Sequence, residues 1–181
     1  MKEIFIKYKS VIRFVVLFLG SYLALSVLYS FYLKTSASGG YFPDYITNLV
    51  ARQTSAILES FGYATVLYEN IARHGVFLTI KDNYTVNIVE GCNSISVIIL
   101  FVSFIIAFAE GFKKTFLFLL VGMVLIYIVN LLRLALLVVA LYKYPEYQDM
   151  LHSVLFPAAI YGMVFLLWIA WVRMLKPSPA P

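Results

Sequence analysis

The sequence predicts an all-α polytopic membrane protein, and the prediction rests on composition and on long apolar runs. Of 181 residues, 62% are hydrophobic and only 13% are charged, and the mean hydropathy is +0.90. A soluble domain of this length must cover itself with more charge. The aromatic fraction of 17% agrees, because Tyr and Trp are favoured where headgroups meet hydrocarbon. We therefore expect lipid to be the main solvent of the chain.

Four apolar stretches approach the length that crosses a bilayer, which is about 20 residues of helix. We expect one integral membrane domain over residues 1–181, with spans at Val11–Leu33, Asn93–Ala109, Thr115–Tyr142 and Ser153–Val172. The first run has a basic start and small residues after it, so a cleaved signal peptide is an alternative. Its apolar core is longer than the usual 7–15 residues of such a peptide, which favours an uncleaved anchor.

The charged residues predict the orientation of these spans, because cytoplasmic loops carry an excess of Lys and Arg. The basic residues that flank the spans fall on one side: Lys2, Lys7, Lys9, Arg13, Lys113, Lys114, Arg173 and Lys176. The acidic residues mostly fall on the other side: Asp44, Glu59, Glu69, Asp82, Glu90, Glu146 and Asp149. We expect both termini in the cytoplasm and the segment Lys34–Gly91 outside.

This outer segment carries signals for one helix and two strands. Pro43–Asp44 is typical of a helix start and Gly62 of a helix stop. Apolar residues recur between them at helical spacing, namely Ile46, Leu49, Val50, Ile57, Leu58 and Phe61. This predicts an amphipathic helix on the bilayer or on the other helices. Val76–Ile80 and Tyr84–Val89 flank a polar turn and predict a small β-hairpin, whose second strand leads to Cys92.

Composition and spacing exclude several other classes of function. The net charge is +5, but the basic residues adjoin apolar runs, which indicates membrane topology and no nucleic-acid partner. The sequence contains no Walker loop, zinc spacing or dinucleotide fingerprint. A single cysteine excludes an internal disulfide, and one Cys with two His lacks the spacing of metal ligands. We expect neither a metal nor a cofactor.

Cys92 is the first candidate for chemistry. A lone cysteine is often an inert small hydrophobe, and that reading stays open. Its surroundings favour reactivity, because it lies at a polar boundary between Glu90–Gly91 and Asn93–Ser94. A thiol at the start of a span would also have its thiolate favoured by the helix dipole and the free amides.

Arg133 lies inside the third predicted span, roughly 12 Å from its outer end at 1.5 Å per residue. A guanidinium at such depth costs roughly 2.5–3.5 kcal/mol on insertion scales and is usually functional or paired. The alternative is a snorkelling or structural arginine. Asn130 is three residues earlier, on nearly the same helix face, and we expect it to hold the guanidinium by a hydrogen bond.

His152 stands at the outer start of the fourth predicted span, three residues after Asp149. A lone interfacial histidine is often passive, but a helical stretch here lets Asp149 orient the imidazole. The other histidine, His74, lies in the outer segment without a matching membrane context and ranks below His152.

The predicted topology brings Cys92, Arg133 and His152 to the outer side on successive spans. Together they supply what acyl transfer needs. A thiolate attacks a peptide carbonyl, a cation stabilises the oxyanion, and an imidazole moves the protons. This convergence predicts a thiol-dependent peptide-cleaving enzyme.

At these residues the chain resembles the exosortase/archaeosortase family of membrane cysteine transpeptidases. The matching pieces, within Val76–Val172, are Glu90–Gly91–Cys92–Asn93–Ser94, Asn130–Leu131–Leu132–Arg133 and His152. The short chain is most similar to the compact F-type exosortases of Bacteroidetes-like bacteria. In the family the cysteine is commonly followed by Ser-Gly or Asn-Gly and soon by an arginine, whereas Asn93–Ser94–Ile95–Ser96 follows here.

The resemblance implies Cys92 as the nucleophile, Arg133 as the oxyanion or substrate clamp, and His152 as the general acid/base. Residues near them are implied to have supporting roles: Asn130, Glu90, Asn93 and Asp149. The implied location is the bacterial inner (cytoplasmic) membrane, with the active site facing the periplasm.

The implied activity is cleavage of C-terminal sorting signals, a transmembrane tail with a basic end, from exported proteins. The product is then transferred to a surface acceptor through a thioester. Two alternatives stay open: a non-enzymatic membrane scaffold or assembly partner with a degenerate site, and a purely hydrolytic membrane protease. The sequence leaves the substrate motif, the acceptor and the oligomeric state open.

Overall fold

A computed structural model describes residues 8–36, 42–71, 74–81 and 84–175. The predicted spans correspond to the helices α2 (Lys9–Ser36), α4 (Ile95–Ala107), α5 (Phe112–Lys143) and α7 (Phe156–Met174). Three stretches are long and apolar enough to cross a membrane, namely Lys9–Ser36, Phe112–Lys143 and Ser153–Met174. The predicted all-α membrane architecture is confirmed.

The second predicted span is shorter than expected. We predicted Asn93–Ala109, but α4 has only 13 residues and is therefore about 20 Å long, against a hydrocarbon core of about 30 Å. It starts late because Ser94 has a left-handed φ of 65°, which a right-handed helix does not accommodate. The helix bundle therefore has three long apolar helices and one short one.

Aromatic packing holds the four helices together. Phe14 of α2 packs on Phe108 at a ring separation of 4.6 Å, and Phe104 of α4 stacks on Trp168 of α7 at 4.4 Å. Gly122 of α5 leaves room for the Phe101 ring, which an added Cβ would strike. Large apolar side chains on the outside of α2 are exposed, and α2 has no buried residue, as expected of a helix in contact with lipid.

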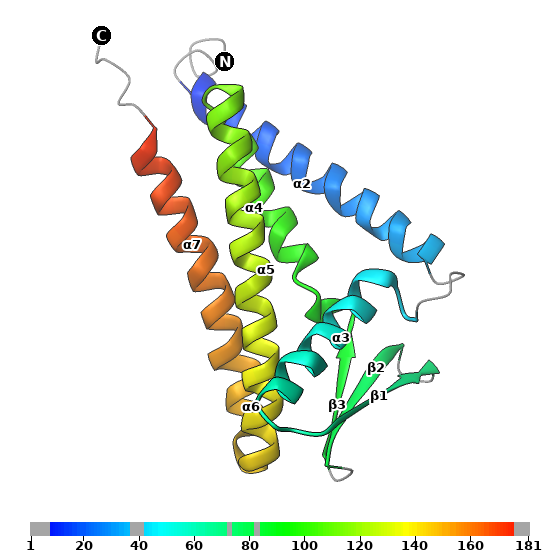
Figure 1. The fold of residues 1–181 in the computed structure, drawn as a ribbon. Coiled ribbons are helices and arrows are strands. Elements are labelled where there is room, and N and C mark those ends of the chain that lie inside the picture. The colour runs from blue at the N-terminus through cyan, green and yellow to red at the C-terminus, as the bar shows by residue number, and fades with distance from the viewer. Residues whose placement is uncertain (1–7, 37–41, 72–73, 82–83, 176–181) are drawn as a thin grey trace.

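The two ends of the bundle differ in character (Figure 1). The start of α2, the α4–α5 turn and the end of α7 lie together at one end, and α3 with the sheet lies at the other. At the first end, Lys114 Nζ donates hydrogen bonds to a Glu110 carboxylate oxygen at 3.1 Å and to the Met174 carbonyl oxygen at 2.5 Å. These bonds tie the α4–α5 turn to the end of α7.

The outer segment contains the amphipathic helix that the sequence predicts. α3 runs over Tyr45–Ser60, and the Asp44 side chain caps it by accepting from the Ile46 and Thr47 amides at 2.9 and 3.0 Å. Gly62, at a φ of 83°, follows the helix end, because this backbone conformation favours glycine. The buried face of α3 packs against α5 and the sheet.

The predicted hairpin is confirmed within a three-stranded antiparallel sheet. β2 (Gly75–Ile80) pairs with β3 (Tyr84–Val89), as expected, and also with β1 (Thr65–Asn70), which the sequence analysis missed. The strand order is β1-β2-β3. Alternate side chains of the sheet join one core with α3 and α5: Val76, Leu78, Ile80 and Ile88. The sheet is thereby fixed against the C-terminal half of α5.

The connection from α5 to α7 is a series of short turns. It contains η3 (Pro145–Tyr147), α6 (Gln148–Met150) and the π-helical turn η4 (Leu151–Leu155). The predicted fourth span therefore begins inside a π-helical turn. Such turns are rare and frequently occur at functional sites.

Candidate active site

The cysteine lies at the junction between the sheet and the helix bundle. β3 ends at Val89 and passes into η2 (Glu90–Cys92), a 3₁₀ turn. Cys92 is a free, partly buried thiol that packs on apolar side chains of both α3 and α5. We expected Cys92 at the start of the second span. In the structure α4 begins three residues later, at Ile95.

Asn93 fixes this turn to three helices. Its Nδ2 donates to the Tyr29 hydroxyl of α2 at 2.7 Å and to Thr47 Oγ1 of α3 at 3.0 Å. Its Oδ1 accepts from the Ile95 amide at 3.0 Å, which satisfies one of the free donors at the start of α4. Asn93 is only 1% exposed. Glu90, which starts the turn, accepts from the Asn93 amide through its backbone carbonyl at 3.4 Å.

Ser94 stands where the resembled family commonly has glycine. Its φ of 65° is the backbone region that glycine adopts without steric cost. Its Oγ is buried and has no hydrogen-bond partner among the described residues. The departure from the family pattern thus places a residue with a Cβ at a left-handed backbone position.

Asn130 of α5 reaches across to the cysteine turn. Its Nδ2 donates to the backbone oxygen of Cys92 at 2.8 Å, and its side chain is 1% exposed. We expected this amide to hold the Arg133 guanidinium, and the structure directs it to Cys92 instead. The reason is that the turn places an unpaired carbonyl beside α5, and a buried carbonyl needs a donor.

Arg133 lies one helical turn further along α5. It is close enough to the Cys92 thiol and to the Tyr161 hydroxyl for electrostatic interaction with both. Its Nε is buried and has no hydrogen-bond partner within the described ranges. A buried donor of this kind normally has a partner, so the Arg133 guanidinium has spare hydrogen-bonding capacity.

The π-helical turn that contains His152 packs on the same apolar side chains as Cys92. Leu151, its neighbour in η4, packs on the apolar cluster of α3 and α5 that also contacts Cys92. The side chains of Asp149 and His152 lie outside the described part of the structure, so their expected roles remain predictions. His74, ranked lower, lies in a turn where its ring stacks on Phe42.

A cleft of about 250 Å³ opens beside Cys92 and is called here the β3 cleft. One wall comes from the sheet: Phe77, Thr85, Val86, Asn87 and Ile88. The other wall comes from α5 and α6: Leu134, Leu137, Leu141 and Gln148. Every lining side chain is uncharged, and polar and apolar side chains both contribute, so the cleft suits a neutral guest.

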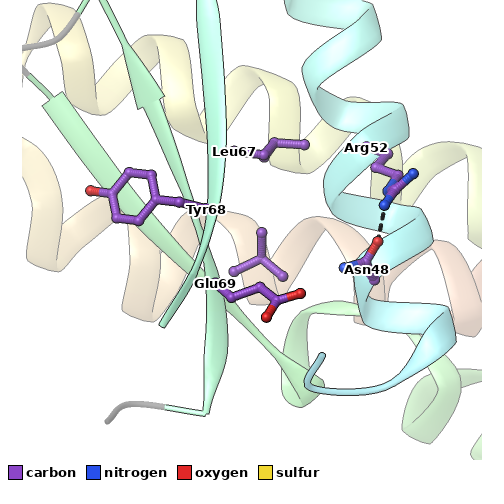
Figure 2. Close-up of a pocket in the computed structure, with 6 residues that line it drawn as sticks. Asn48, Arg52, Leu67, Tyr68 and Glu69 are labelled. Carbon is purple, nitrogen blue, oxygen red and sulfur yellow. Dashed lines mark hydrogen bonds between the residues drawn. The ribbon is translucent and has the colours of Figure 1, made fainter. Parts of the chain in front are cut away.

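A smaller hollow of about 120 Å³ lies between α3 and β1, away from Cys92. Figure 2 shows Arg52 Nε hydrogen-bonded to Asn48 Oδ1, at 2.7 Å, with Glu69 on the facing strand. Tyr68 points away from the helix (Figure 2), and hydrogen bonds with Thr79 and Thr85 lower the pKa of this phenol. None of the sequence-predicted site residues lines this hollow.

Tyr161 is the residue near the site that sequence reasoning missed. It lies on α7 and is 55% exposed, and its hydroxyl interacts electrostatically with Arg133. A tyrosine in the outer half of an apolar span was the available signal. It was hidden among 14 tyrosines in the sequence.

A protein-family model described as transmembrane exosortase matches residues 10–175, which is most of the chain. No curated protein and no solved structure matches. The matched region contains all the helices and strands described above except Lys9, the first residue of α2, and it includes the cysteine turn, Arg133 and His152.

Proposed function

Because the chain belongs to the transmembrane exosortase family, we propose that it is a membrane cysteine transpeptidase that cleaves C-terminal sorting signals from exported proteins. One observation carries the proposal. The hydrogen bond from Asn130 to the Cys92 carbonyl joins the thiol's turn to α5, one helical turn from a guanidinium with an unpaired donor. This bond links the segment of the nucleophile, which lines the β3 cleft, to the helix that carries the cation.

The first step is attack by the Cys92 thiolate on the carbonyl carbon of the scissile peptide. The new C–S bond pushes the carbonyl electrons onto oxygen and gives a tetrahedral oxyanion. Collapse of this intermediate breaks the C–N bond. The sorting signal leaves as an amine, and the exported protein stays on Cys92 as a thioester.

Arg133 has the role of stabilising the oxyanion. Donors placed where charge develops are worth much more in a dry site than in water. The unpaired Nε of Arg133 and its electrostatic interaction with Cys92 support this role, because a donor already engaged elsewhere would have to break a bond first.

His152 has the role of general acid/base, taken from the family motif at this position. It accepts the thiol proton and delivers it to the leaving amine. It then accepts a proton from the acceptor nucleophile, an amine or another group, which attacks the thioester carbonyl. The C–S bond breaks, and the proton returns to the released Cys92 thiolate. Asp149 would orient the imidazole. The packing of Leu151 beside the Cys92 cluster supports a place for this turn in the site.

The proposed location is the bacterial inner membrane, with the sheet, α3 and Cys92 on the periplasmic side. The support is electrostatic, because Lys and Arg accumulate on the cytoplasmic side of membrane proteins. Lys9, Lys114 and Arg173 lie on segments that meet at the opposite end of the bundle (Figure 1). An exported substrate then reaches Cys92 without crossing the membrane again.

The test is co-expression with an exported protein that bears an apolar tail and a basic end. Mass spectrometry compares its C-terminus in the presence of the wild type, Cys92→Ala and the control Ser96→Ala, an exposed position on α4. We expect tail removal with the wild type and the control and none with Cys92→Ala. A new mass on the shortened C-terminus indicates transfer, and a free carboxylate indicates the hydrolytic protease. Equal processing by Cys92→Ala would refute catalysis by this thiol and favour the scaffold.

A further inference from the structure

β3 is an edge strand of the sheet, and its outer edge has no strand partner among the described residues. An edge strand presents a row of free backbone N–H and C=O groups. Proteins often protect such edges with charge or with a covering element. β3 instead ends at the turn that holds Cys92, so its free edge leads directly to the proposed nucleophile.

The β3 cleft lies along this edge and also reaches Phe77 of the neighbouring strand β2. Val86 and Ile88 face the core, since their cross-strand partners on β2 are buried apolar residues. Side chains alternate along a strand, so Thr85 and Asn87 point to the opposite face. All four of these consecutive residues line the cleft. A cavity that touches both faces of one strand must wrap around its edge.

The wall of the cleft that α5 forms determines which side chains an occupant can carry. Leu134, Leu137 and Leu141 recur along one face of α5 opposite the strand. An added strand would hydrogen-bond to β3 on one side and bury apolar side chains against these leucines on the other. The uncharged lining disfavours Asp, Glu, Lys or Arg in the part of the guest that enters the cleft.

We propose that the β3 edge binds the extended segment of the exported substrate next to its scissile bond, as an added fourth strand. This inference rests on the proposed function, and it assigns the substrate site to the β3 cleft. Main-chain pairing holds an extended peptide with little demand on its side chains. Because β3 continues into the Cys92 turn, pairing with it delivers a peptide carbonyl to the thiol in a fixed register.

Binding to the cleft can be measured separately from catalysis. The probe is a fluorescent synthetic peptide copied from the residues that precede the apolar tail of the co-expressed exported protein. A series of such peptides is made, each methylated at one backbone nitrogen. The affinity of each peptide for full-length Cys92→Ala in nanodiscs is measured by fluorescence anisotropy. Every second N–H of an added strand points at β3. We expect alternate methylations to weaken binding about tenfold, the cost of one lost buried hydrogen bond, and the others to change it little.

A matched pair of labelled positions tests the location. Cys92→Ala removes the single cysteine of the sequence, so Thr85→Cys or Val66→Cys can be alkylated selectively. Both positions are exposed and lie on the two edge strands, and both pair with Thr79 of β2. A bulky maleimide on Thr85→Cys should abolish peptide binding. The same label on Val66→Cys, at the far edge, should leave binding intact.

The outcomes separate the two proposals. Absence of binding, losses that do not alternate, or equal effects of the two labels would overturn the added-strand site, even where the wild type processes the substrate. Alternating losses with a block only at Thr85→Cys would support the site. If the peptide binds in this way but the wild-type protein does not remove the tail of the co-expressed substrate, the binding site is supported and the proposed activity is contradicted.

Discussion

The side-chain amide of Asn130 donates a 2.8 Å hydrogen bond to the backbone oxygen of Cys92, across 38 positions of sequence. This bond fixes the position of the cysteine turn relative to Arg133, since both Asn130 and Arg133 belong to α5. Asn130 positions the thiol, whereas Arg133 supplies a positive charge. Substitutions at Asn130 and at Arg133 should therefore have different consequences.

We expect Asn130→Ala to lower both stability and processing. It leaves the buried Cys92 carbonyl without its donor, which costs about 1–3 kcal/mol of unfolding free energy. The freed turn misplaces the thiol, and a small misplacement of a reacting group costs roughly 100-fold in rate. Thermal unfolding in detergent and the processing rate per folded molecule check the two effects. Leu132→Ala, at a 50% exposed position of the same helix, is the control. Unchanged processing per folded Asn130→Ala molecule would contradict the positioning role.

Arg133→Lys should leave the protein abundant but inactive. Lysine keeps the charge and costs about the same to insert, yet lacks the planar fork that presents several donors in fixed directions. Loss of one oxyanion donor lowers the rate by roughly 10²–10³, and we expect a decrease of that size in tail removal.

Arg133→Gln and Arg133→Leu should be at least as inactive and should still insert in the membrane. Quantitative immunoblotting of membranes gives the abundance, and mass spectrometry gives the processing rate. Near wild-type processing by Arg133→Lys would leave the arginine as a structural cation. Loss of the protein in every variant would instead indicate a packing role.

Ser94→Gly should stabilise the protein. The left-handed backbone costs a residue with a Cβ about 1–2 kcal/mol relative to glycine, and the substitution also removes a buried hydroxyl without a described partner. The greater freedom of glycine in the unfolded chain offsets about 0.5–1 kcal/mol of this. We therefore expect a higher thermal midpoint with processing retained. Ser94→Val should do the opposite, because a β-branched residue is a true outlier at positive φ. A lower midpoint for Ser94→Gly would contradict the strain at this position.

Reporter fusions test the orientation. A periplasm-dependent reporter placed after Gly40 should be active, and one placed after Lys114 should be inactive, because basic residues favour a cytoplasmic position for the α4–α5 turn. A cytoplasm-dependent reporter at the same two points should give the reverse pattern. The same result at both points would mean that the two ends of the bundle lie on the same side of the membrane. It would contradict a periplasmic active site.

Much of the fold was determined by local sequence. The apolar runs, the Asp44 cap and the strands on either side of the polar turn at residues 81–83 are short-range patterns, and each formed the expected element. Their physical basis lies within a few residues: helix period, side-chain acceptors for free amides, and alternation along a strand. The family pieces at Cys92, Arg133 and His152 were likewise readable from residue type and order.

Only the tertiary structure decided what joins distant segments. β1 forms a strand because it pairs with the second edge of β2. The local sequence of Thr65–Asn70 did not predict a strand. α4 starts at Ile95 because Ser94 is left-handed and Asn93 is bound to α2 and α3. Asn130 is hydrogen-bonded to the Cys92 carbonyl and not to Arg133, and Tyr161, on another helix, interacts electrostatically with the guanidinium. Such partners are determined by packing between elements that are far apart in the chain. The fold, and not the spacing in the sequence, decides which donor lies next to a buried acceptor.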